Sequence, residues 1–337
     1  MVSIKDIALR CNVSAATVSK ALNDHSDVGP ATKQRVREAA REMGYLPNSM
    51  ARGLKTKKSY NIGVLMVDKA NSGLTHHYFS SILDSFKVTM EQNGYDLTFI
   101  SSHVGDISCS YYEHCVYRNV DGVFVACVDF STDAVKQLLE SDLPVVSIDY
   151  VGEGGYAVVS DNEKGMRDAL EFALGCGHRK IAYIYGEDSQ VTSARLSAFY
   201  DVMQAHGCEV CEPLLRQARY LDGDLSYRLT QELLQCGERP TCILYPDDTC
   251  AMAGMSAIRE AGLTIGRDVS VIGYDGTPLL RMLRPHLTTI QQDTETMGRK
   301  AADMLLRLLR KQEILTEERV QYCSGTLLKG ETVETPV

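Results

Sequence analysis

Residues 13–23 read VSAATVSKALN, and this stretch decides how the amino-terminal segment folds. Ser14 can begin a helix, because a serine hydroxyl accepts a hydrogen bond from a backbone N–H of the first helical turn. Val18, Ala21 and Leu22 follow at helical spacing and should face inward. The outer face of this helix then presents small residues and one cation: Ala15, Ala16, Thr17, Ser19 and Lys20. A helix with such a face can approach another surface closely.

Two further helices are predicted on either side of this one. Ser3 and Asp6 make a start that resembles a capping box, and Asn12 fits the next turn because asparagine tolerates the left-handed conformation. Pro30 suits the first position of a third helix, which should end at Gly44. Two short helices joined by a turn of about three or four residues and closed by a third predict a helix-turn-helix.

The second helix of a helix-turn-helix enters the major groove of DNA. We therefore expect Lys20 to donate to guanine acceptors, and Ala15 and Ala16 to pack against thymine methyl groups. Nearby polar side chains suit phosphate contacts, which position a protein without specifying a base sequence: Thr17, Ser19 and Asn23. The alternative is a small structural three-helix bundle with no role on DNA.

Charge divides the chain at the end of this segment. Residues 1–60 carry a net charge of +6, whereas the remaining residues carry −15. A basic module on an acidic body is the arrangement expected of a nucleic-acid reader on a carrier that avoids nucleic acid. No apolar run is long enough to span a membrane and no signal peptide is evident, so we expect a soluble cytoplasmic protein without a membrane partner. Eleven scattered cysteines favour reduced thiols over a disulfide framework.

The acidic body alternates short apolar runs with amphipathic segments. The apolar runs predict buried parallel strands: NIGVLMV, YDLTFIS, DGVFVACV, PVVSIDY, KIAYIYG, TCILYP and VSVIGYD. Helices are expected over about 79–93, 193–206 and 250–261. At 337 residues, with the strand–helix scheme repeated in each half, the chain predicts two doubly wound α/β lobes. A cleft should lie at the carboxyl ends of their strands.

Motifs of catalysis and cofactor binding are absent from the sequence. It has no GxGxxG after a strand, no GxxxxGK[ST], no GxSxG and no HExxH. The CxxC at Cys208 and Cys211 lacks a partner pair at zinc spacing, so we expect no metal, no cofactor and no enzyme. A solute-binding transport protein would share the body, but it would need a signal peptide and would lack a basic headpiece, so the sequence does not favour this class.

The segment SIKDIALRCNVSAATVSKALND, continuing to VGPATKQRVREAAREMGYLPNSMARGL, resembles the headpiece of the LacI/GalR family of bacterial transcription regulators. The resemblance implies that the hinge PNSMARGLKTKKS becomes helical only on operator DNA. Within it Asn48 would cap the hinge helix, Ala51 would touch the minor groove, and Leu54 would wedge into the groove and kink the DNA. It also implies DNA contacts from Ser14, Thr32 and Tyr45.

Residues 60–333 resemble the periplasmic-binding-protein-like core of the same family, in the phrases VVSDNEKG, GHRKIAYIYG, SARLSAFYDVM, DVSVIGYDG and LTTIQQD. By this resemblance one arginine, several carboxylates and aromatic rings form an effector pocket. Such groups grip vicinal hydroxyls, since the charged groups hydrogen-bond them and a ring stacks on the sugar face. Each aspartate taken alone would more often be a helix cap or a loop acid. The implied set is Tyr78, Phe79, Asp149, Asp161, Arg195, Asp247, Asp275 and Gln292, with Asp247 standing where many sugar-binding members have asparagine.

The sequence therefore predicts an all-α helix-turn-helix headpiece joined to an α/β core of two doubly wound parallel-sheet lobes. We expect a homodimeric repressor of carbohydrate metabolism that binds a palindromic operator, because identical headpieces on a palindrome require two-fold symmetry. The effector should be a sugar or sugar derivative, and the alternative is a purine or phosphorylated metabolite acting as co-repressor. The expected boundaries are 1–46 for the headpiece, 47–59 for the hinge, 60–160 with 293–322 for the amino-terminal lobe, and 161–292 with 323–337 for the carboxyl-terminal lobe.

Overall fold

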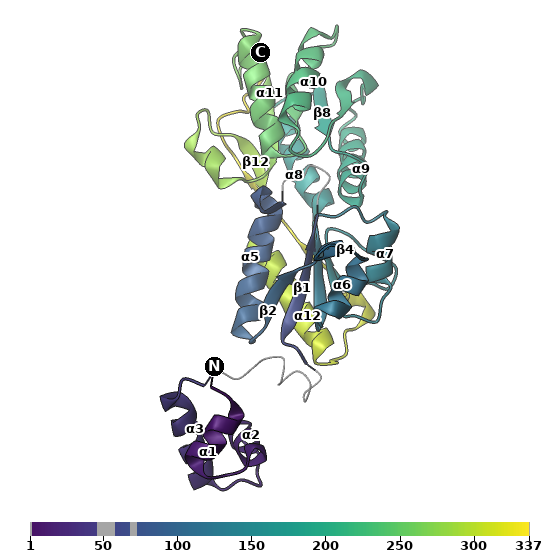
Figure 1. The fold of residues 1–337 in the computed structure, drawn as a ribbon. Helices are drawn as coiled ribbons and strands as arrows, with labels where there is room; N and C mark the ends of the chain where they lie inside the picture. The colour runs from purple at the N-terminus through teal and green to yellow at the C-terminus, as the bar shows by residue number, and fades with distance from the viewer. Residues whose placement is uncertain (1, 46–57, 68–72, 337) are drawn as a thin grey trace. The chain divides into compact units, whose positions relative to one another are not determined.

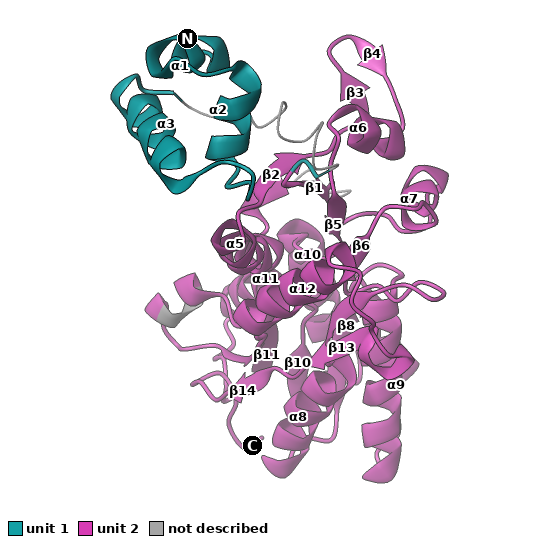
Figure 2. Cartoon of the chain, turned by 90° about the horizontal axis from the view of Figure 1, so that it is seen from below, with its two compact units in different colours: residues 1–59 teal, residues 60–337 magenta. Residues whose placement is uncertain are grey.

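The computed structural model describes residues 2–45, 58–67 and 73–336 (Figure 1). The chain divides into two compact units, residues 1–59 and residues 60–337, which Figure 2 draws in different colours. We describe each unit by itself.

The first unit holds three helices, α1 (Ile4–Cys11), α2 (Ala15–Leu22) and α3 (Pro30–Glu42). The capping box of Ser3 and Asp6 is confirmed, and so is the cap of α2, where the hydroxyl of Ser14 accepts from the backbone N–H of Thr17 at 3.0 Å. Asn12 has the expected left-handed conformation, with φ of 45°. The three helices enclose a small apolar core of Ile7, Ala8, Cys11, Val18, Ala21, Val28, Val36, Ala39 and Ala40.

The first sheet of the second unit is parallel throughout, with the strand order β13-β7-β6-β5-β1-β2. Its strands are β1 (Asn61–Met66), β2 (Asp96–Phe99), β5 (Gly122–Ala126), β6 (Val145–Ile148), β7 (Ala157–Ser160) and β13 (Val320–Cys323). Helices α5 (His77–Gln92) and α12 (Thr294–Leu309) pack side by side against this sheet (Figure 1). Helices α6 (Tyr111–Tyr117) and α7 (Asp133–Leu139) cover a separate apolar cluster. Short elements complete this lobe: η1 (Gly73–Thr75), η4 (Thr316–Glu318) and the hairpin of β3 (His103–Val104) and β4 (Ile107–Ser108).

The second sheet has the strand order β14-β12-β11-β10-β8-β9, and only the β12–β14 pair is antiparallel. Its strands are β8 (Ile181–Tyr185), β9 (Leu215–Gln217), β10 (Cys242–Leu244), β11 (Ser270–Asp275), β12 (Thr288–Gln291) and β14 (Thr326–Leu328). Two helix pairs build separate cores on it: α8 (Asn162–Gly175) with α9 (Gln190–Ala205), and α10 (Gly223–Gln235) with α11 (Asp248–Glu260). The short helices are η2 (Glu212–Leu214) and η3 (Pro278–Met282).

The chain passes between the two sheets three times, after β7, after β12 and after β13. The carboxyl ends of these strands therefore meet where the lobes join, which is where open α/β sheets bind ligands. The predicted fold class, a helix-turn-helix headpiece with two doubly wound lobes, is confirmed. Within the described residues, no helix has the length and apolar character needed to cross a membrane.

Candidate DNA-binding and effector sites

The outer face of α2 is composed as the sequence predicts. Ser14, Ala15, Ala16, Lys20 and Asn23 are exposed. Thr17 and Ser19 are half-buried, and the Thr17 hydroxyl lies 2.8 Å from the Ser14 hydroxyl. This face is small and polar, so a base edge can come close to the helix backbone.

The cation of this face, Lys20, forms an ion pair with Asp27 in the loop before α3. Lys20 also holds the pKa of Asp27 below its ordinary value through this hydrogen bond. Asn23 is used locally, since its side-chain amide donates to the Ser19 carbonyl at 2.7 Å. A DNA base that accepts from Lys20 must therefore compete with Asp27.

Two other predicted DNA contacts lie at the edges of α3. Thr32 in its first turn is half-buried. Tyr45 follows the helix and packs partly buried against the apolar core. The predicted hinge contacts Asn48, Ala51 and Leu54 lie outside the described residues.

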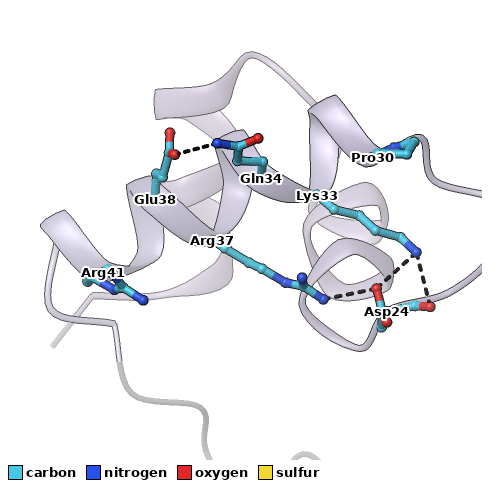
Figure 3. A pocket seen from close by; sticks show the side chains of 7 residues that line it. All are labelled: Asp24, Pro30, Lys33, Gln34, Arg37, Glu38 and Arg41. Atoms are coloured by element: carbon cyan, nitrogen blue, oxygen red, sulfur yellow. Dashed lines mark hydrogen bonds and ion pairs between the residues drawn. The ribbon is translucent and has the colours of Figure 1, made fainter.

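A groove of about 580 Å³ lies along α3, and Figure 3 shows the side chains that line it. Lys33 and Arg37 both point to Asp24, each with a nitrogen 2.9 Å from the Asp24 Oδ1. Gln34 donates to Glu38 at 3.0 Å on the neighbouring stripe of the helix. The lining carries the cations Lys33, Arg37 and Arg41 and the carboxylates Asp24 and Glu38, so the groove has only a small net positive charge.

In the second unit, a pocket of about 230 Å³ lies where β6 and β7 of one lobe meet the starts of α8 and α9 of the other. Two predicted residues, Asp149 and Asp161, line this pocket. Across it the lobes are joined at Val151, whose N–H donates to Gln190 Oε1 at 2.8 Å and whose carbonyl accepts from Gln190 Nε2 at 3.1 Å. The remaining lining residues are Val159, Ser160, Asn162, Glu163, Val191, Ala194 and Tyr322.

Arg195, on α9 next to this pocket, is only 3 % exposed. Its Nε donates to Asn162 Oδ1 and one Nη donates to the Pro246 carbonyl, both at 2.8 Å. Its guanidinium carbon lies 3.4 Å from the ring centroid of Tyr274 and 5.8 Å from that of Tyr220. These contacts use two of five N–H groups and fix the plane of the guanidinium, so further donors remain for a ligand.

Tyr78 and Asp149 are brought together, as the resemblance implies. The Tyr78 hydroxyl donates to Asp149 Oδ2 at 2.6 Å, and the Ser160 N–H donates to Asp149 Oδ1 at 2.8 Å. Burial raises the pKa of Asp149, opposed by these hydrogen bonds. Phe79 is half-buried with its ring centroid 4.9 Å from that of Tyr78.

Two of the four predicted aspartates cap helices. Asp161 Oδ1 accepts from the Lys164 N–H at 3.2 Å at the start of α8, and its Oδ2 accepts from the Ser324 hydroxyl at 3.1 Å. Asp247 caps α11 and is 1 % exposed. Asp161 is half-buried and can reach a ligand in the pocket, whereas Asp247 is enclosed by protein.

Asp275 and Gln292 form a pair at the carboxyl ends of β11 and β12. Gln292 Nε2 donates to Asp275 Oδ1 at 2.6 Å. Burial raises the pKa of Asp275 well above its ordinary value, and the charges of Asp248 and Asp247 raise it further, against the attraction of Arg195. Arg195 therefore lies within electrostatic reach of both Asp149 and Asp275.

Sequence reasoning missed three residues of this region: Asn162, Tyr220 and Tyr274. Asn162 directly follows Asp161, and Tyr274 directly precedes Asp275. Tyr220 lies three residues after β9, a strand too short to show an apolar period. The sequence feature that could have identified Tyr220 is its place two residues before Asp222, the N-cap of α10. Among the described residues, no cluster of histidine, cysteine or carboxylate side chains can hold a metal ion.

Known proteins share both units. The family model of bacterial regulatory proteins of the lacI family matches residues 3–48, and that of the periplasmic binding protein-like domain matches residues 170–333. The chain is 30% identical over 342 residues to the HTH-type transcriptional repressor PurR of Vibrio parahaemolyticus, covering 99% of each protein. It is 32% identical to the PurR repressor of Klebsiella pneumoniae, covering 93% of this chain and 92% of that protein. The lac repressor dimer bound to operator and the anti-inducer ONPF has a TM-score of 0.84 at 27% identity, covering 99% of both chains.

The chain therefore belongs to the lacI family of bacterial regulatory proteins. It is a DNA-binding transcriptional regulator controlled by a small effector, and it is not an enzyme.

Proposed function

We propose that this chain represses genes of carbohydrate metabolism by binding a palindromic operator as a homodimer, and that its effector is an uncharged sugar held between the two lobes. The observation that carries the proposal is the group around Arg195: one buried guanidinium, tyrosine rings, and the half-buried carboxylates Asp149 and Asp275. Hydroxyl groups can donate to these carboxylates and accept from the guanidinium at the same time.

The electrostatics of the cleft disfavour an anionic effector. Asp149, Asp161 and Asp275 are its half-buried carboxylates, while Asp247 and Asp248 lie buried behind them and add negative potential at Asp275. Arg195 is the single cation opposing them among the side chains described above. A phosphate placed here would be repelled by each of these carboxylates that is ionised, and its own charge would raise their pKa values further. A neutral polyhydroxyl compound meets no such repulsion.

A neutral purine base is the second candidate, and two observations favour it. The chain is similar over its whole length to repressors named PurR. The half-buried ring of Tyr220 also lies opposite Arg195, where a flat base can stack on it. The same cleft therefore suits either a sugar face or a base, and the two classes are separated by experiment.

The test is a thermal-shift screen of the full chain with neutral pentoses, hexoses and disaccharides, their phosphates, and purine bases. A ligand at a hundred times its dissociation constant stabilises the native state by about 2.7 kcal/mol. We expect a neutral sugar to raise the melting temperature, and Arg195→Lys to abolish the rise, because a lysine cannot replace the fork of donors that Arg195 presents. Circular dichroism of that variant checks that it remains folded.

Each other outcome decides between the candidates. If only a purine base raises the melting temperature, the effector is a purine and not a sugar. A shift from phosphorylated compounds alone would contradict the electrostatic argument. Operator binding, measured with and without the active ligand, then shows whether the effector releases the protein from DNA or holds it there.

The DNA-binding part of the proposal rests on the α2 face together with the hinge positions Asn48, Ala51 and Leu54. Leu54→Ala should lower operator affinity and reduce DNA bending while the effector still binds. Unchanged affinity and bending, measured by gel mobility on a permuted operator set, would remove the wedge role from Leu54.

A further inference from the structure

The loop of residues 218–222, between β9 and α10, carries the Tyr220 ring to Arg195. Three contacts hold this tyrosine. Its N–H donates to Glu187 Oε2 at 2.9 Å, and its hydroxyl lies 3.0 Å from the Thr192 hydroxyl. Its ring covers Gly186, where an added Cβ would lie 2.3 Å from a ring carbon. The ring is therefore set in one place before any ligand arrives.

The next residue, Leu221, has an unusual backbone. Its φ is 61°, in the left-handed region that leucine rarely adopts, so another interaction must stabilise this turn. The Leu221 N–H donates to Asp247 Oδ2 at 2.8 Å. This hydrogen bond connects the strained residue of the Tyr220 loop to the start of α11.

Both oxygens of Asp247 already accept hydrogen bonds from the protein. Its Oδ1 accepts from the Cys250 N–H at 2.8 Å and caps α11, while its Oδ2 accepts from Leu221 and also from the Cys250 thiol at 3.2 Å. The side chain is buried. A ligand could reach Asp247 only by displacing the protein groups that bury it.

The two N–H groups also require a carboxylate at this position. Leu221 and Cys250 donate to different oxygens of one side chain. An asparagine has a single oxygen, so its NH₂ group would face one of the two backbone N–H groups, donor against donor. A buried N–H left without an acceptor is costly. We expect the Leu221 N–H, rather than the Cys250 N–H, to lose its acceptor, because the turn at Leu221 is strained.

We propose that Asp247 is a positioning residue: it fixes the loop that places the Tyr220 ring beside Arg195, and it does not contact the effector. Only the consequence for effector affinity rests on the proposed function. Asp247 then acts through its two acceptor oxygens, and its effect on effector specificity passes through Tyr220.

The test uses a tryptophan reporter, because the chain contains no tryptophan. Tyr220→Trp makes the loop the sole source of tryptophan emission in the full chain. Adding Asp247→Asn should shift the emission maximum to longer wavelength and increase quenching by acrylamide, since the ring leaves its packed position. The matched control is Asp222→Asn, two residues after Tyr220, where asparagine keeps the α10 cap to Leu225. This control should leave both signals unchanged.

The outcomes separate a positioning role from a general loss of structure. Asparagine can still cap α11, so circular dichroism of Asp247→Asn should match that of the parent protein. Emission and quenching that stay unchanged in the folded Asp247→Asn protein would overturn the proposal, and so would equal changes in the Asp222→Asn control. Neither result depends on knowing the effector.

Effector titration gives the second readout, in the protein that retains Tyr220. Asp247→Asn should weaken binding about tenfold, because binding must then order the loop. The Asp222→Asn protein should bind as the parent does. An unchanged emission maximum together with unchanged effector affinity in Asp247→Asn would show that Asp247 is only a helix cap. If the emission maximum shifts but none of the tested ligands binds, the proposed effector is wrong and the positioning role stands.

Discussion

Arg195 shows how one side chain organises the effector region. It donates to Asn162 and Pro246, and its guanidinium stacks on Tyr274. The pKa of this arginine is raised because the surrounding tyrosines and Asp275 outweigh the effect of its burial. The residue is therefore charged and rigid, and both properties are needed to orient the hydroxyls or ring nitrogens of a ligand.

On the DNA side, the corresponding residue is Lys20. Lys20→Ala should lower discrimination at one base position by about ten- to a hundredfold, because a lost base-edge contact affects one base pair. Operators selected from a randomised DNA pool by the parent and variant proteins give the measurement. Equal weakening on all sequences would show that Lys20 contacts a phosphate instead.

Asp248 gives a pH-dependent prediction. It lies buried beside Asp247, and burial raises its pKa from 3.8 to about 7. Because its pKa is higher in the native than in the unfolded state, its contribution to stability is complete below the unfolded value. It is lost as pH rises from 3.8 to about 7.

Asp248→Asn mimics the protonated form, since the amide can donate to Thr289 and accept from the Thr277 N–H. The parent protein should lose urea resistance between about pH 4 and pH 7, and Asp248→Asn should reduce that loss. Asp201→Asn, on the exposed face of α9, serves as control. A slope identical in all three proteins would contradict the role of Asp248.

Among the secondary-structure elements, the amino-terminal ends of helices lie along the cleft. Asp161, Ser189 and Asp247 cap α8, α9 and α11, and all three follow the carboxyl ends of strands by a few residues. Helices α9 and α11 begin about three and two residues before the starts expected from apolar periodicity. The capping side chains, which periodicity ignores, decide where the helices begin.

The packing of α8 on β11 yields a prediction at this scale. A Cβ at Gly165 would lie 2.0 Å from the Tyr274 hydroxyl oxygen. Gly165→Ala should therefore destabilise the protein by about 2 kcal/mol and displace the ring that supports Arg195. Gly175→Ala in the same helix meets no atom within 4 Å and should be neutral or slightly stabilising. Urea unfolding compares the two variants, and equal stability would show that Tyr274 can move without cost.

At the scale of the whole molecule, the proposed homodimer needs an apolar surface. Leu279, Met282 and Leu283 lie on and just after η3 and are exposed, Met282 to 81 %. Clustered exposed apolar side chains mark interaction surfaces more often than free surface. These residues are therefore our candidates for contact with a second copy of the chain.

Met282→Asp should convert the dimer to a monomer and weaken operator binding, because a charge would be buried in the interface. Leu315→Asp places the same charge on an exposed leucine in the other lobe and should leave the dimer intact. Sedimentation velocity measures the result. A dimer that persists in Met282→Asp would place the interface on another surface.

The predictable part of the fold follows from local patterns. The caps at Ser3 and Ser14, the apolar strand runs and the proline at the start of α3 all act within a few residues. The hairpin of β3 and β4 and the strands β9, β13 and β14 were not predicted, because these short strands are partly exposed and show no clear apolar run. Tyr220 was missed for the same reason, since its position depends on β9.

The headpiece, the two α/β lobes and the family could be predicted from the sequence alone, because each depends on patterns among residues that are close along the chain. The partners of the charged groups could not be predicted in this way, because they come from other, mostly distant, parts of the chain. Lys20 meets Asp27 across a loop, Arg195 stacks on Tyr274, and Asp247 holds Leu221 in place of a ligand. These contacts join residues up to 79 positions apart, and their geometry follows from how the chain returns to the carboxyl ends of its sheets.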